Sequence, residues 1–177
     1  MNKPLKSIEK KLFQEGIEKL IEWTNKKNVD VHFGHCLTDE YRPADSLITI
    51  STRFGEEKQL YAFLHECGHL LLGKDEKNYT KKYPSSAKMW QFNSNKRLER
   101  SKKYKVDVVS EEIDAWRKGK EIAKRLDIHV NDENYYSFMS ECEKRGVNRK
   151  FLFATVIKTD GSKENFNLGF LTKESTK

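Results

Sequence analysis

Residues 60–72 read LYAFLHECGHLLL and place the pattern His-Glu-x-x-His inside a helix-like apolar sequence. On a helix, residues four apart lie on one face, so His65 and His69 can present two imidazole nitrogens to one metal ion. Glu66 lies about 100° round the helix from His65, where it can reach a water on that metal rather than the metal itself. Two His ligands, a third ligand from elsewhere and a carboxylate beside them indicate a zinc hydrolase.

The apolar residues around this motif recur at helical spacing and predict a buried stripe on the other side of the helix. They are Leu60, Phe63, Leu64, Cys67 and Leu71. Gly68 costs a helix about 1 kcal/mol relative to Ala, so its place within the motif predicts the close approach of another chain segment. The competing interpretation is a buried helix with two incidental histidines.

The composition describes about one domain with a well-solvated surface, since 36% of the 177 residues are hydrophobic and 34% are charged. No apolar run approaches the roughly 18–20 residues of a membrane span, and the first residues lack the apolar core of a signal peptide. We therefore expect a cytoplasmic protein without a membrane partner. Cys36, Cys67 and Cys142 are too scattered for a disulfide framework, and we interpret Cys67 as a small buried hydrophobe.

Three elements precede the motif. Between residues 7 and 28, apolar residues recur every three to four positions among Lys and Glu, which predicts an amphipathic first helix. Residues 29–33 alternate in polarity and residues 47–51 are rich in β-branched side chains, so both are expected to be strands. A polar turn is expected between them, over residues 38–45.

This order of a helix, a strand, a loop, a second strand and a helix with His-Glu-x-x-His and a Leu-rich end resembles the ImmA/IrrE-type metallopeptidases. These are minimal gluzincin-like zinc proteins of bacteria, phages and mobile elements. The resemblance covers roughly residues 7–126. It implies a zincin-like α+β fold, a zinc cofactor, and site-limited cleavage of a regulatory protein such as a repressor.

The third ligand in that family is the first Glu of a Glu-x-Glu-Ala-Asn-x-x-Ala pattern on a later helix. Residues 112–119 are similar, and the resemblance places the third ligand at Glu112. Asp114 occupies the position of the second Glu and is the alternative ligand or an outer orienting residue. Two other interpretations stay open, because acidic residues favour the first turn of any helix and because His32 or His35 could bind the metal instead.

The helix that carries this pattern departs from the family in its support of the metal site. Ser110 is its expected N-cap. Trp116 replaces the amide or acid that often supports a zinc-bound His, so this support must come from elsewhere or be missing. The Leu-Leu-Met-Pro segment that follows this helix in the family is absent. Tyr61, Tyr104 or another aromatic residue is a candidate donor to the oxyanion of the reaction, and the sequence does not say which.

A basic insert over residues 74–109 separates the two helices. From Lys74 to Lys105 the chain has eleven Lys or Arg and only three acids, with aromatic residues between them. The net charge of the whole chain is +7. We expect a long loop here, either a lid over the site or a surface for nucleic acid or substrate. The contacting residues are expected to be Lys96, Arg97, Arg100, Lys102 and Lys103. Since both flanking helices must meet at one metal, we expect this charge beside the cleft.

The chain beyond the resemblance is expected to add a small extension. Residues 131–146 predict a short helix, and residues 151–157 and 166–170 predict the strands of a β-hairpin. The whole is therefore predicted to be an α+β, zincin-like metallopeptidase domain over residues 1–128, followed by a C-terminal helix and β-hairpin over residues 129–177.

The predicted function is that of a zinc-dependent endopeptidase acting on a protein or peptide substrate. Zinc is expected to be bound by His65, His69 and Glu112, with Glu66 as the general base. The alternative is a nucleic-acid-binding or protein-binding regulator that keeps the fold without proteolysis. Glu66 favours chemistry, because a binding module has no need of a carboxylate beside the water.

Overall fold

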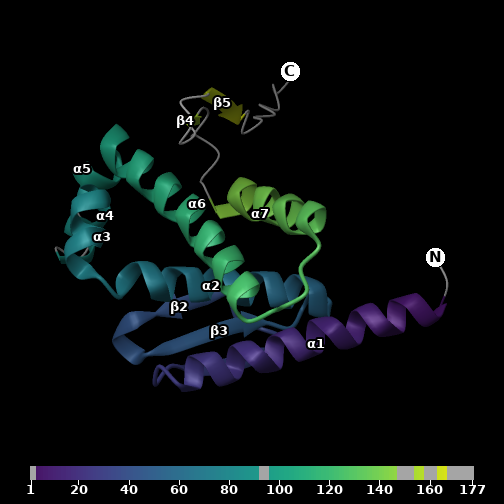
Figure 1. The fold of residues 1–177 in the computed structure, drawn as a ribbon. Helices are drawn as coiled ribbons and strands as arrows, with labels where there is room; N and C mark the ends of the chain where they lie inside the picture. Colours follow the sequence, from purple (N-terminus) through teal and green to yellow (C-terminus); the bar gives the residue numbers. More distant parts are fainter. Residues whose placement is uncertain (1–2, 92–95, 147–153, 158–162, 167–177) are drawn as a thin grey trace, which may run out of the picture.

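The fold of the chain was obtained as a computed structural model, which describes the backbone of residues 3–91, 96–146, 154–157 and 163–166 and the side chains of residues 7–89 and 97–142. It is an α+β fold in which helices surround a small three-stranded mixed sheet (Figure 1). The helices are α1 (Lys3–Asn25), a 3-10 turn η1 (Pro43–Asp45), α2 (Glu56–Gly73), α3 (Glu76–Lys82), α4 (Pro84–Gln91), α5 (Lys96–Glu99), α6 (Lys102–Arg125) and α7 (Asp132–Gly146). The strands are β1 (Asp30–Gly34), β2 (Glu40–Arg42), β3 (Leu47–Ser51), β4 (Ala154–Ile157) and β5 (Lys163–Phe166).

The three-stranded sheet has the order β1-β3-β2. β1 runs parallel to β3, whereas β2 runs antiparallel to it on the other side. The expectation of a polar turn is therefore wrong for residues 40–42, which form the edge strand β2. Three polar residues carry too little pattern to predict a strand, and the backbone of β3 supplies the pairing that makes them one.

The core lies between α1, α2, the sheet and α7. Phe13 and Leu20 of α1 are buried there together with Leu60 and Phe63 of α2, as their spacing predicts. Ile8, one of the apolar residues that recur between residues 7 and 28, remains 58% exposed, because the first turns of α1 extend past the other elements (Figure 1). Cys67 is fully buried, as expected of a small hydrophobe.

Helices α2 and α6 approach each other closely enough for backbone to touch backbone. A Cβ atom added at Gly68 would lie 2.0 Å from the carbonyl oxygen of Ala115, and one added at Gly119 would lie 2.5 Å from that of Leu64. This is the close approach that Gly68 predicts within the motif. The crossing fixes which residues of α6 face the histidines of α2.

The basic insert is helical rather than a long loop. It forms α3, α4 and α5, and α6 begins at Lys102, with Ser101 as its N-cap accepting a hydrogen bond from the backbone N–H of Tyr104. The expectation of an N-cap at Ser110 is therefore wrong, since Ser110 lies well inside α6. Residues 102–105 are mostly Lys, so no apolar pattern marks the first turn of α6.

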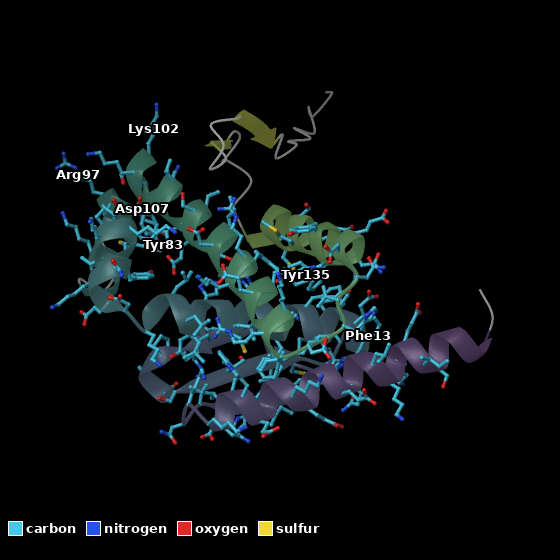
Figure 2. The ribbon with its side chains drawn as sticks, viewed as in Figure 1. Phe13, Tyr83, Arg97, Lys102, Asp107 and Tyr135 are labelled. Carbon is cyan, nitrogen blue, oxygen red and sulfur yellow. The ribbon has the colours of Figure 1, made fainter. Side chains whose placement is uncertain are left out.

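Two carboxylates of α6 hold the insert in place. Asp114 accepts a hydrogen bond of 2.6 Å from the hydroxyl of Tyr83, and Asp107 accepts one of 2.6 Å from the backbone N–H of Ser85 in the first turn of α4. Figure 2 shows Tyr83 and Asp107 in the space between these helices. Tyr83 is itself buried, so the insert has a small core of its own against α6.

The C-terminal extension begins as predicted with α7, which packs Tyr135 and Phe138 into the core. β4 and β5 form the expected antiparallel hairpin, with the second strand placed three residues earlier than predicted. Residues 151–153 and 167–170 of the predicted strands lie outside the described residues. No helix in the described part of the chain is long and apolar enough to cross a membrane.

Candidate metal centre

Three side chains converge at the crossing of α2 and α6. The Nε2 atoms of His65 and His69 lie 3.2 Å apart, one helical turn from each other on α2. The carboxylate of Glu112 on α6 lies 3.2 Å from His65 Nε2 and 3.5 Å from His69 Nε2. These three residues form a group that could hold a metal ion.

The separations between these donor atoms fit a small divalent cation. Zinc binds nitrogen and carboxylate oxygen at about 2.0–2.1 Å in a tetrahedron, which sets neighbouring donors about 3.3 Å apart. The observed separations of 3.2, 3.2 and 3.5 Å match this spacing. Two imidazoles with one carboxylate suit zinc and its transition-metal neighbours better than calcium or magnesium, which prefer oxygen ligands only.

The charges around the histidines favour a cation at this point. Burial alone would lower the pKa of His69, but the nearby carboxylates of Glu111 and Glu112 outweigh burial and raise the pKa to about 10. Burial would raise the pKa of Glu112, and its hydrogen bonds with His65 and His69 outweigh burial and lower it. A divalent cation can replace the protons that this cluster otherwise attracts.

Glu111 supports His69 from behind, a role that the sequence did not predict. Its Oε1 atom lies 3.7 Å from Nδ1 of His69, on the side of the ring away from the metal group. A carboxylate on the second nitrogen fixes the tautomer and orientation of a metal-binding His. The signal was present as an acidic residue next to Glu112, but sequence alone does not say which way each neighbour points.

His65 is oriented differently. Its ring stacks on the indole of Trp116, with the ring centres 4.3 Å apart and the planes inclined by 26°. Its buried Nδ1 atom has no hydrogen-bond partner within the described part of the chain. The outer support that the sequence predicted to be replaced or missing at Trp116 is thus an aromatic stacking contact.

Glu66 lies beside the metal group without belonging to it. It is buried, its Oε1 atom is 3.9 Å from His65 Nε2, and its Oε2 atom accepts a hydrogen bond of 2.8 Å from the backbone N–H of Tyr41 in β2. Burial raises the pKa of Glu66 against the opposing influence of His65 and His69. The edge strand that the sequence analysis missed therefore holds the predicted general base in position.

The metal group and Glu66 open into a cavity of about 590 Å³. One wall is β2 with the residues next to it, and the opposite wall is formed by α3 and α6, including Tyr79 and Glu111. Burial and the nearby Glu111 raise the pKa of Tyr79, so its hydroxyl keeps its proton. Neither Tyr61 nor Tyr104, the donors considered from the sequence, lines this cavity, and Tyr61 instead bonds to Glu57.

The other predicted site residues lie away from the metal group. Asp114 points to Tyr83 and to Lys82, whose Nζ atom lies 2.7 Å from it, so its expected role as alternative ligand or orienting residue is wrong. His32 and His35 are exposed and outside the group.

The basic residues of the insert do not reach the cavity either. Arg97, Arg100, Lys102 and Lys103 are exposed, and Figure 2 shows Arg97 and Lys102 projecting from the end of the insert that lies away from α2. The side chain of Lys96 lies outside the described residues. The expectation that this charge lies beside the cleft is therefore wrong for Arg97 and Lys102.

Comparison of the chain with protein-family models, with curated proteins and with solved structures gave no match. The function is therefore argued from the geometry of this site alone.

Proposed function

We propose that the protein is a zinc-dependent endopeptidase with a zincin-like active site. The observation that carries this proposal is the meeting of two imidazole nitrogens and the Glu112 carboxylate beside a second, buried carboxylate, Glu66. A site that only stores or senses a metal has no use for that second carboxylate. The substrate class that the sequence resemblance implies is a regulatory protein such as a repressor.

Metal binding and proton transfer are assigned to different residues in the proposed reaction. His65, His69 and Glu112 would hold zinc, which when bound lowers the pKa of a water and polarises a peptide carbonyl. Glu66 takes the proton from the attacking water and delivers it to the nitrogen of the leaving amine. The bond from Tyr41 fixes one oxygen of Glu66, which leaves the other free to accept that proton.

Tyr79 lies on the opposite wall of the same cavity, and its raised pKa keeps its hydroxyl protonated. The hydroxyl oxygen itself is buried, so donation to the attacked carbonyl oxygen requires the side chain to turn toward the cavity. The cavity of about 590 Å³ beside these residues has room for part of a bound substrate.

The first test is metal content. Protein purified without chelators should carry about one zinc per chain, measured by elemental mass spectrometry, and the His69→Ala variant should carry none. Zinc should also raise the midpoint of thermal unfolding, because a ligand that binds only the folded state stabilises it. Protein that holds no zinc and takes up none would end the metal proposal.

The second test is cleavage. Glu66→Gln changes the carboxylate to an amide of similar size that cannot accept the proton, so it should retain zinc and lose activity on a polypeptide library by at least about 100-fold. A zinc-loaded wild type that cleaves nothing would support the alternative of a binding regulator. A Glu66→Gln variant as active as wild type would refute the assigned base.

A further inference from the structure

A second cavity of about 390 Å³ lies on the other side of the metal group. It shares Asp39, His65 and Glu66 with the first cavity, so the two meet at the side chains proposed to act on the peptide bond. A polypeptide bound across His65 and Glu66 therefore has its neighbouring side chain at the mouth of the second cavity.

The interior of this cavity is largely aromatic. Trp116, which stacks on His65, meets the ring of Phe138 edge-on at 6.0 Å, and Phe138 meets Phe54 edge-on at 6.2 Å. All three residues line the cavity. Because Phe138 belongs to α7, the C-terminal extension contributes directly to the surroundings of the metal group.

The two cavities differ in chemistry. The lining of the first is rich in carboxylates, including Glu40, Glu76 and Glu111, which make it less suited to an apolar side chain than the second. At the second, Arg53 is held by a hydrogen bond of 3.1 Å from its Nε atom to the hydroxyl of Ser51. Asp39 and Glu66 line the same cavity and offset this cation, so charge does not choose the occupant, whereas the aromatic rings favour apolar side chains.

We propose that this second cavity is a specificity pocket that takes a bulky apolar side chain, from Phe, Tyr, Trp, Leu or Met, of the residue next to the bond that is cut. The inference rests on the proposed peptidase function and adds its substrate class. Ala62 forms part of the pocket floor, one turn before His65 and Glu66 on the same face of α2. Its small side chain leaves the space open.

The test uses the zinc-loaded full chain and a peptide library, with cleavage sites read by mass spectrometry. Wild type should prefer a large apolar residue on one side of the cleaved bond over Ala by at least about tenfold in kcat/KM, since even one methylene in such a pocket is worth about 10–200-fold. Ala62→Leu should fill the pocket from α2 and lower this preference by about tenfold. Ala44→Leu makes the same change at an exposed residue that lines neither cavity and should keep the wild-type preference.

A second variant and a binding measurement keep the result interpretable. Cys142→Phe narrows the pocket from α7, at a partly buried position, and should reduce the preference even if Ala62→Leu does not fold. The Kd of Glu66→Gln for two peptides that differ only as Phe or Ala reports the pocket without cleavage, and the Phe peptide should bind at least about tenfold more tightly.

The outcomes separate the two proposals. Cleavage without an apolar preference, or a preference that neither variant changes, would overturn the pocket and leave the peptidase. A preference in binding to Glu66→Gln with no cleavage by wild type would support the pocket and overturn the peptidase. Equal binding of the two peptides would overturn the pocket whatever the activity.

Discussion

His65 and His69 have the same chemistry but different surroundings. His69 has Glu111 behind its Nδ1 atom, whereas His65 is held by the face of Trp116. A carboxylate adds basicity to the ring it supports, and an aromatic face adds only orientation. The two ligands are therefore unequal in how strongly the residues behind them favour a bound metal.

The two neighbouring glutamates of α6 should be separable by mutation. Glu112→Ala removes a proposed ligand and should weaken zinc binding by more than about 100-fold. Glu111→Ala removes only the outer carboxylate and should weaken it by about 10–100-fold. Competition with a zinc-chelating dye measures both affinities. The reverse order, with Glu111→Ala the more damaging, would show that Glu112 is not the third ligand.

The sequence predicted the three residues that could hold a metal ion but not the residues that support them. His65, Glu66 and His69 follow from spacing on one helix, and Glu112 followed from a resemblance in pattern. The roles of Glu111, Tyr41 and Tyr79 depend on how separate elements are rotated against each other. That rotation is set by tertiary contacts such as the crossing of α2 and α6, which no local pattern encodes.

At the scale of elements, the contact between α2 and α6 controls the metal site. The Gly68 contact with Ala115 lies between His65 and His69 along α2, so the spacing of the two helices there determines the distance from the histidines to Glu112. Any residue larger than glycine at position 68 would force α2 and α6 apart.

Gly68→Ala should therefore damage both stability and metal binding. The added methyl group would lie 2.0 Å from a backbone oxygen, which α6 can relieve only by moving, and overpacking of this kind costs about 1–3 kcal/mol or more. Gly73→Ala is the matched control in the same helix, because nothing lies within 4 Å of its Cβ position and Ala favours helix. Urea unfolding and zinc titration should find loss in the first variant and none in the second. Equal behaviour of the two would mean that the helices do not meet as described.

The insert shows where prediction from sequence failed. α3, α4 and α5 have 7, 8 and 4 residues, which is too short for stability as isolated helices. Their Lys-rich sequences also lack a clear apolar period, so a loop was expected. Contacts with Asp107 and Asp114, more than twenty residues away, stabilise α3 and α4 instead.

Asp114→Ala should loosen the insert without removing the metal. Hydrogen bonds to charged groups contribute about 1.5–3 kcal/mol, and Asp114 bonds to Tyr83 and pairs with Lys82. Hydrogen exchange should rise in α3 and α4, while zinc content stays at the wild-type level. Loss of zinc together with unchanged exchange in the insert would instead identify Asp114 as a ligand.

At the scale of the whole molecule, opposite charges are separated along α6. Carboxylates gather at the metal group, and basic side chains are exposed at the beginning of the helix. Lys102 precedes Glu112 by ten residues, or about 15 Å at 1.5 Å per residue. Tyr83 is buried and Tyr79 lines the cavity, so neither of them is available for base stacking on the outer surface of the insert.

This surface should bind a polyanion through charge alone. The expected ligand is duplex DNA, with binding that weakens by about 0.9 log units per log unit of salt for each phosphate contact. Reversing the charge of Lys96, Arg97, Arg100, Lys102 and Lys103 together should abolish binding to a duplex oligonucleotide at low salt. The control reverses five exposed basic residues of α1, of the turn after it and of the end of α6, namely Lys11, Lys19, Lys26, Lys124 and Arg125. Both variants change the net charge from +7 to −3, because each reversal removes two charges.

Only the position of the charge differs between these two proteins, so fluorescence anisotropy with one labelled duplex compares them directly. Loss of binding in the insert variant with retention in the control would locate the polyanion surface on the insert. Equal loss in both would assign binding to net charge, which acts at long range and is screened by salt over about 10 Å at 0.1 M. If wild type does not bind at all, the positive charge of the insert serves solubility, because like charges keep molecules apart.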